Sequence, residues 1–149
     1  MSVVVVSVDI AAPPKAVWDF ALDPACTREW VTIVREVGHV DEGPLRPGFR
    51  MDQTLVLRGM PFGVRWTLEE VDAPWYARWV GAGPAGARAV IEDRLHERED
   101  GGTRFDYRNE FHTPFGPLGA VASRVVMGGI GEREAKASLQ RLKVRFEGD

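Results

Sequence analysis

The most constraining feature of this sequence is a change of period after a long series of alternating runs. Six runs alternate between apolar and polar residues and are separated by turn signals rich in Gly, Pro and Asp: 33–41, 48–57, 64–72, 76–82, 88–98 and 103–112. Period two predicts β-strands, and the short turns predict antiparallel neighbours. From 117 to 146 the apolar residues recur every three or four positions, which predicts a long terminal helix.

One more strand and two short helices are predicted before these runs. Residues 3–9 are mostly β-branched and predict a strand. A helix is predicted over 14–21, because Pro suits a first turn and the apolar side chains that follow share one face. Asp23 and Pro24 then predict the start of a second helix of about two turns.

The order of these elements predicts an α+β architecture. We expect one domain over residues 1–149, because no repeat, linker or low-complexity segment divides the chain. A meander of seven strands curls, and a long amphipathic helix needs an apolar surface to cover. We therefore expect a curved, seven-stranded antiparallel sheet that wraps around the long C-terminal helix, with two short helices beside it.

Three stretches carry a resemblance to a known family: VDIAAPPKAVWDFALDPACTREW at 8–30, LEEVDAPWYARWV at 68–80 and EDGGTRFDYRNEF at 99–111. With this order of elements, the chain resembles the START-like or SRPBCC superfamily and its polyketide cyclase/dehydrase-like family. The resemblance covers nearly the whole chain and implies a helix-grip fold, usually with a cavity for a hydrophobic small molecule. The motifs mark architecture and carry no chemistry of their own, so they constrain the fold more than the function.

Composition excludes several classes of protein. The 149 residues can bury one sizeable core, and no run of about 18 apolar residues predicts a membrane span. The N-terminal stretch lacks a basic signal region and Cys26 is the single cysteine, so we expect a cytoplasmic protein without disulfides. A net charge of -3 without a basic stripe argues against a nucleic-acid partner.

The run TRFDYRNEF suggests a ligand site, because its inward parity contains polar groups. Arg and Glu occupy one parity, so Tyr107, Asn109 and Phe111 are predicted to face inward. An unpaired phenol or amide in a dry core costs about 1 to 3 kcal/mol, and a ligand or buried water removes that cost. The alternative is that Tyr107 reaches the rim and Asn109 bonds a neighbouring strand's backbone.

Five further residues are candidates for the ligand site. Trp66 is predicted at the pocket wall, and Val125 lies on the apolar stripe of the terminal helix. Arg78 alternates with Trp79, so one of the two must face inward, and an inward Arg78 would select an anionic or phenolate ligand. Asp93 shares a parity with apolar neighbours; it is either an inward carboxylate of raised pKa, suited to acid–base work, or it returns to water at a bulge or edge.

Metal and cofactor sites are not predicted. His39, His96 and His112 show no paired spacing, so we expect neither a metal nor a cofactor. The glycines between 128 and 131 fit neither a phosphate loop nor a dinucleotide fingerprint. They predict a kink or a lid, and the pattern does not choose between these two.

The function expected from the sequence is binding of a hydrophobic, ring-containing small molecule in an internal cavity. Whether the protein is an enzyme stays open: a polyketide cyclase/dehydrase-like member would orient the ligand and move protons through Tyr107, Asn109 and Asp93. The alternative is a protein-interaction module that resembles the chaperone-activating members of the superfamily and uses the outer face of the sheet. The oligomeric state is left open as monomer or homodimer.

Overall fold

A computed structural model of the protein describes residues 2–112 and 130–148. The described elements follow the predicted order, with three helices, two 3₁₀ turns and seven strands: β1 (Ser2–Ile10), α1 (Pro14–Ala21), η1 (Pro24–Cys26), α2 (Thr27–Trp30), β2 (Val34–Gly38), β3 (Arg50–Leu57), β4 (Met60–Asp72), β5 (Tyr76–Ala82), η2 (Pro84–Gly86), β6 (Arg88–Glu97), β7 (Thr103–His112) and α4 (Ile130–Glu147).

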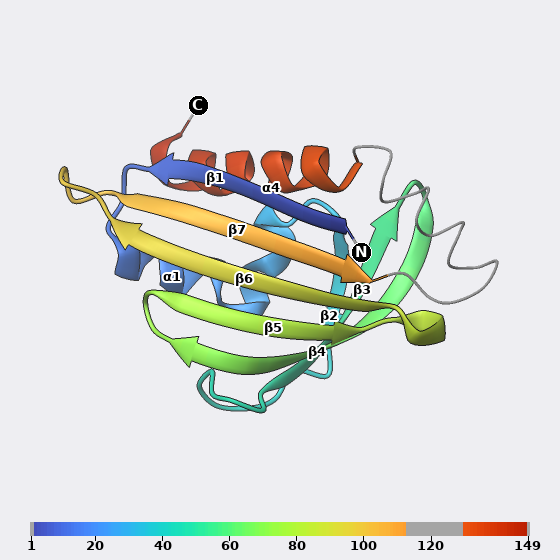
Figure 1. The fold of residues 1–149 in the computed structure, drawn as a ribbon. Coiled ribbons are helices and arrows are strands. Elements are labelled where there is room, and N and C mark those ends of the chain that lie inside the picture. The colour runs from blue at the N-terminus through green and yellow to red at the C-terminus, as the bar shows by residue number, and fades with distance from the viewer. Residues whose placement is uncertain (1, 113–129, 149) are drawn as a thin grey trace.

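The seven strands form one antiparallel sheet in the order β1-β7-β6-β5-β4-β3-β2. The sheet curves, and the helices lie on its concave side, with α4 beside β1 (Figure 1). This is the helix-grip fold that the sequence predicts. No helix among the described residues is both long enough and apolar enough to cross a membrane.

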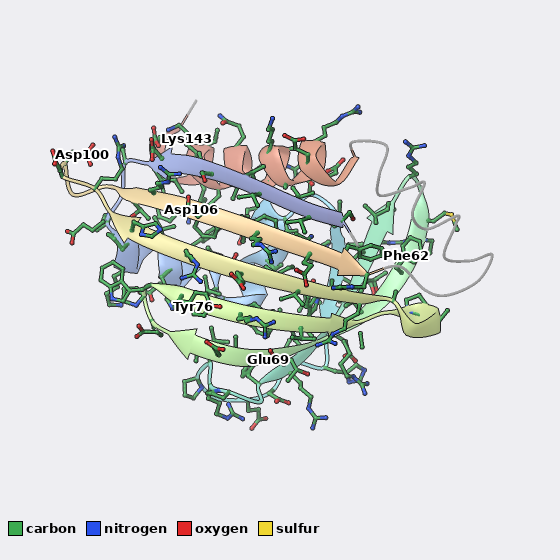
Figure 2. All side chains as sticks on the ribbon, viewed as in Figure 1. Phe62, Glu69, Tyr76, Asp100, Asp106 and Lys143 are labelled. Carbon is green, nitrogen blue, oxygen red and sulfur yellow. The ribbon has the colours of Figure 1, made fainter. Side chains whose placement is uncertain are left out.

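Alternation of side chains decides what each face of the sheet contacts. On β7, Thr103 and Phe105 are fully buried, whereas Arg104 between them is exposed. The convex face carries charged side chains, among them Glu69 and Asp106, which are labelled with Tyr76 in Figure 2. Asp106 accepts hydrogen bonds there from Ser7 and Arg104. The concave face therefore holds the core, and the convex face meets water.

Element boundaries differ from the predictions mainly at turns. The predicted strand 33–41 is shorter, because β2 ends at Gly38 and His39 has a positive φ of 46°. The predicted strand 64–72 begins earlier, at Met60, because Arg58 and Gly59 both have positive φ and form a two-residue hairpin turn.

Two predicted helices, the second short helix and the long terminal helix, differ from the structure or are described only in part. The second short helix is a 3₁₀ turn followed by a single α-helical turn, instead of about two continuous turns. The terminal helix is present as α4 over Ile130–Glu147, and positions 117–129 of the prediction lie outside the described residues. Gly131 lies in the first turn of α4, and Gly128 and Gly129 are also outside the described part.

Candidate functional site

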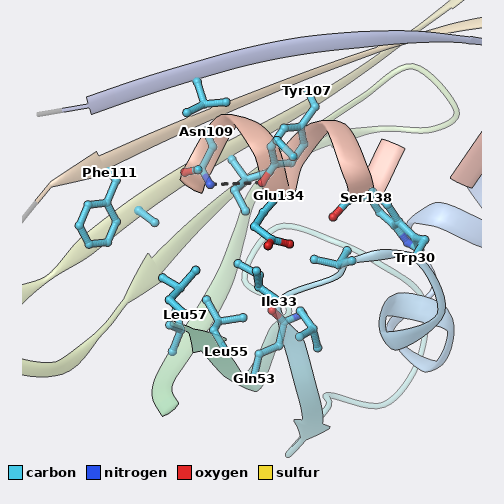
Figure 3. A pocket seen from close by; sticks show the side chains of 18 of the residues that line it. Trp30, Ile33, Gln53, Leu55, Leu57, Tyr107, Asn109, Phe111, Glu134 and Ser138 are labelled. Carbon is cyan, nitrogen blue, oxygen red and sulfur yellow. Dashed lines mark hydrogen bonds between the residues drawn. The ribbon is translucent and has the colours of Figure 1, made fainter. Parts of the chain in front are cut away.

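A cavity of about 130 Å³ lies between the concave face of the sheet and the N-terminal half of α4 (Figure 3). Its described walls are mostly aliphatic and aromatic, with a few polar side chains. The residues that line it are Val4, Trp30, Val31, Ile33, Val34, Gln53, Leu55, Leu57, Val64, Trp66, Ala89, Ile91, Tyr107, Asn109, Phe111, Gly131, Glu134, Ala135, Ser138 and Leu139. Small-molecule sites commonly combine apolar walls with few polar groups in this way.

Strand β7 supplies the polar pair that the sequence predicts to face inward. Asn109 Nδ2 donates a hydrogen bond to the Tyr107 hydroxyl oxygen over 3.2 Å, and the carbonyl oxygen of Asn109 is buried with no partner among residues 2–112 and 130–148. Burial and the neighbouring Asp93 raise the pKa of Tyr107 well above its usual value, so the phenol keeps its proton. The pair therefore offers the cavity a hydroxyl proton and an acceptor oxygen. The structure thus differs from the alternative, in which Tyr107 reaches the rim and Asn109 bonds the backbone of a neighbouring strand.

Trp66 forms a wall of the cavity and is held from two sides. Its indole Nε1 donates to Gln53 Oε1 over 2.9 Å, and both side chains are buried. The ring lies over Gly81 on the neighbouring strand, where an added Cβ would be only 2.7 Å from a ring carbon of Trp66. A glycine is therefore required at position 81 for the indole to occupy this place.

The opposite wall comes from α4 and the loop after α2. Glu134 projects from α4 into the cavity (Figure 3). The Thr32 hydroxyl donates to one of its carboxylate oxygens. The backbone N–H of Thr32 donates to Ser138 Oγ over 3.0 Å. These hydrogen bonds tie the loop to the helix at the edge of the cavity.

Trp30 borders both the cavity and the packed core. Its ring makes an edge-to-face contact with Phe105, with ring centroids 6.0 Å apart. Only 5% of Trp30 is exposed, and its indole N–H finds no hydrogen-bond partner in the described part of the chain. The residue thus anchors α2 over the sheet and also contributes to the cavity wall.

Asp93 lies directly across from Tyr107 in the β6–β7 register. Only 6% of the residue is exposed, and one carboxyl oxygen has no partner among the residues that the structure describes. Burial raises the pKa of Asp93 to about 7. The inward placement is the one of the two sequence alternatives that the structure adopts. The carboxyl is not among the groups that line the cavity.

The structure brings four of the eight predicted site residues to the cavity: Trp66, Tyr107, Asn109 and Phe111. Trp79 points inward but packs against Phe49 in the core, with ring centroids 6.2 Å apart. Arg78 lies on the convex face, ion-paired with Glu69 and Glu92, so its predicted place in the cavity is corrected. Neighbouring side chains on a strand face opposite sides of the sheet, so Arg78 lies on the convex side because Trp79 lies on the concave side. Val125 is outside the described residues.

Four polar or aromatic contributors were missed by the sequence argument: Trp30, Gln53, Glu134 and Ser138. Trp30 is not among the residues that the sequence predicts for the site, and polar residues on a helix ordinarily face solvent. A usable signal did exist on α4. Small residues at 131, 135 and 138 continue the inward stripe that ends in Leu142, and small side chains there leave space unfilled.

Metal ligation has no support in the described part of the chain. Residues 2–112 and 130–148 contain no group of three His, Cys, Asp or Glu side chains placed to hold an ion. His96 instead contacts Asp106, and His112 contacts Glu110, both on the convex face.

Comparison with known proteins gives a family match over almost the whole sequence. The family described as polyketide cyclase / dehydrase and lipid transport matches residues 1–147. The protein named Toxin Rv0910 of Mycobacterium tuberculosis is 26% identical over 143 residues, covering 95% of this chain and 96% of that protein. Uncharacterized protein Rv1546 of the same species is 28% identical over 134 residues, covering 87% and 92%.

Solved structures share the fold at low sequence identity. The Zhui aromatase/cyclase from a Streptomyces species has a TM-score of 0.81 at 16% identity, covering 98% of this chain and 93% of that chain. The protein TTHA0849 from Thermus thermophilus has a TM-score of 0.78 at 19% identity, covering 98% and 97%. At these identities the likeness concerns the fold alone.

Proposed function

Because this chain belongs to the polyketide cyclase / dehydrase and lipid transport family, we propose that it binds a small, hydrophobic, ring-containing molecule in the cavity between the sheet and α4. The observation that carries the proposal is the Tyr107–Asn109 pair, which presents a buried acceptor oxygen that no described residue pairs with. Such an oxygen costs about 1 to 3 kcal/mol when it stays unpaired. A ligand that donates a hydrogen bond there would remove the cost.

The size of the cavity supports a ligand of one ring. An apolar cavity of about 150 Å³ made in another protein binds benzene. The volume here, about 130 Å³, is close to that value, and the aliphatic and aromatic walls suit a flat apolar body.

Binding can be tested with benzyl alcohol and the Asn109→Leu variant, followed by NMR. The indole N–H signals of Trp30 and Trp66 report on the cavity, and Trp75, 41% exposed and away from the cavity lining, serves as the control. We expect saturable shifts of the two cavity signals, weakened at least several-fold by Asn109→Leu. Without ligand the variant should melt at or above the wild-type temperature, because Leu is nearly isosteric and apolar.

Two results would contradict this proposal. Benzyl alcohol that moves no cavity signal of the wild-type protein would argue against a binding site. A variant that is less stable by about 1 to 3 kcal/mol with unchanged binding would make Asn109 a structural residue.

If the cavity binds the probe, native mass spectrometry of freshly purified protein can identify the natural ligand by its mass.

Processing of the bound molecule is a second candidate, supported by Asp93. A buried carboxyl that holds its proton near neutral pH, across the ladder from a cavity-facing phenol, suits general acid–base chemistry. The test is deuterium exchange at the carbon next to the carbonyl of cyclohexanone in D₂O. Acceleration by the wild-type protein that falls at least about tenfold in Tyr107→Phe would support processing. No acceleration would leave binding alone.

Growth inhibition is a candidate that comes from the relative named a toxin. Expression of this chain in a bacterial host tests it directly. Growth arrest that Asn109→Leu relieves would connect toxicity to the cavity, and normal growth at high expression would oppose the candidate.

The protein-interaction alternative has less support. It would need an apolar outer face, and the described convex face carries ion pairs such as Arg78 with Glu92 and Arg108 with Glu110. Exposed apolar side chains there include Val3 and Val5 on the edge strand. The cavity is therefore the better-supported site.

A further inference from the structure

The described wall of the cavity has charge of one sign. Glu134 is the carboxylate among these lining residues, and none of the described ones is Lys, Arg or His. The arginines of the adjoining strands lie on the convex face, where Arg78 contacts Glu69 and Glu92 and Arg108 contacts Glu110. No described cation is thus placed in the cavity to receive an anionic ligand group.

Glu134 is held in place by the loop opposite. The Thr32 hydroxyl donates to Oε2 of Glu134, and the Thr32 backbone N–H donates to Ser138 on the next turn of α4. The other carboxylate oxygen, Oε1, receives no hydrogen bond from the described residues. Figure 3 shows the carboxylate inside the cavity, across from the Tyr107 hydroxyl. An acceptor oxygen is therefore available to a bound molecule.

The β7 wall does not select a charge. Tyr107 can donate its hydroxyl proton, and Asn109 offers a carbonyl oxygen, so both donors and acceptors on a ligand find a partner there. Within the described part of the wall, Glu134 is then the group that can select between ligands of different charge. Because the cavity is mostly apolar, opposite charges attract and like charges repel more strongly there than in water.

We propose that the cavity selects ring compounds that carry an O–H or N–H donor, neutral or cationic, and rejects carboxylates of the same shape. The inference rests on the proposed binding function. The donor pairs with the free oxygen of Glu134, whereas a ligand carboxylate would lose water and meet a like charge without a described cation nearby. Fatty acids and aromatic acids would then be poor ligands.

Three probes of nearly equal size test the selection at neutral pH: benzylamine, benzyl alcohol and benzoate. Their dissociation constants are measured from the Trp30 and Trp66 indole N–H shifts, with Trp75 as the exposed reference. For the wild-type protein we expect benzylamine and benzyl alcohol to bind at least about tenfold more tightly than benzoate. Glu134→Gln, which keeps an acceptor for Thr32, should bring benzylamine and benzoate to within about threefold of each other.

Glu132→Gln is the matched control, because Glu132 has the same charge, lies on the same helix and pairs with Lys136 outside the cavity. It should leave the preference unchanged. Binding of all three probes with similar affinity, or an unchanged preference in Glu134→Gln, would overturn this inference while leaving the binding function in place. Failure of every probe to shift either cavity signal would overturn both.

Discussion

The two ends of the space between the sheet and α4 differ in how completely they are filled. Toward the C-terminal end of α4, Leu142 is fully buried in a cluster with Phe105 and Ile10. Toward its N-terminal end, Gly131, Ala135 and Ser138 face a cavity. The same helix thus packs a core with large side chains and leaves a cavity where its side chains are small.

The strands show the same division. On β7, Phe105 is in the solid core, and Tyr107 and Asn109, two and four residues later, line the cavity. On β6, Leu95 is in the core and Ala89 lines the cavity. The backbone pattern of α4, β6 and β7 is the same along the whole space between sheet and helix, and only the volume of the side chains changes. Side-chain volume therefore divides this space into a packed half that stabilises the fold and a hollow half that can bind a ligand.

The largest effect is expected at Trp30, which belongs to both halves. Trp30→Ala removes the edge-to-face contact with Phe105 and the packing that holds a single helical turn in place. We expect the free energy of unfolding to fall by about 3 to 5 kcal/mol, measured by chemical denaturation. An unchanged stability would show that Trp30 belongs to the cavity wall alone.

A matched pair of leucines separates the two halves directly. Leu142→Ala in the solid core should lower the free energy of unfolding by about 2 to 5 kcal/mol, because the deletion opens a new void. Leu55→Ala at the cavity wall should lower it by less than about 2 kcal/mol, because Leu55 is only partly packed. Equal losses in urea denaturation would contradict the division into halves.

The titration of Asp93 should make the stability of the folded protein depend on pH. The pKa of Asp93 is about 7 in the folded protein and near 3.8 in the unfolded chain. Between these two pH values the folded state binds more protons than the unfolded state. The free energy of unfolding therefore falls as pH rises from about 4 to about 7. Asp93→Asn removes this titration. We expect a gain of about 1 to 3 kcal/mol above pH 8, because the pKa difference limits the gain to about 4 kcal/mol and the buried amide retains unpaired groups.

Melting curves of both proteins from about pH 4 to about pH 9 check the Asp93 prediction. Wild type and variant should be close in stability at the acidic end and diverge as pH rises. Parallel curves at every pH would mean that Asp93 does not titrate in the folded state as proposed.

The smallest effect concerns the glycine beneath Trp66. Gly81→Ala places a methyl group into the indole ring and should cost about 1 to 2 kcal/mol while shifting the Trp66 indole signal. Gly63→Ala is the control, because a Cβ there meets no atom within 4 Å. If Gly81→Ala leaves the Trp66 signal as unmoved as Gly63→Ala does, the predicted close contact between Gly81 and the Trp66 ring is wrong.

Local sequence signals predicted most of the fold. The alternation of 76–82 and 103–112 gave both strand boundaries, and the proline and apolar spacing of 14–21 gave the helix. These signals depend on a few neighbouring residues, which is why they can be read without the tertiary structure. Turn conformations were harder, because Arg58 adopts a positive φ that its residue type does not favour.

The inward direction of Tyr107 and Asn109 was also determined by the sequence. Their strand has charged residues at every other position, and burial of four charges would be too costly. For Arg78 and Trp79 the alternation left two faces open, and the core around Phe49 decided which one is inside.

Only the tertiary structure decided where the cavity lies and which side chains enclose it. Glu134 and Ser138 are polar residues on a helix, and they face inward because the loop at Thr32 covers them. Their partners are more than 100 residues away along the chain, so no local period encodes the contact. Alternation and helical period determine which face a side chain occupies, whereas the volume left between two faces depends on every residue that packs there.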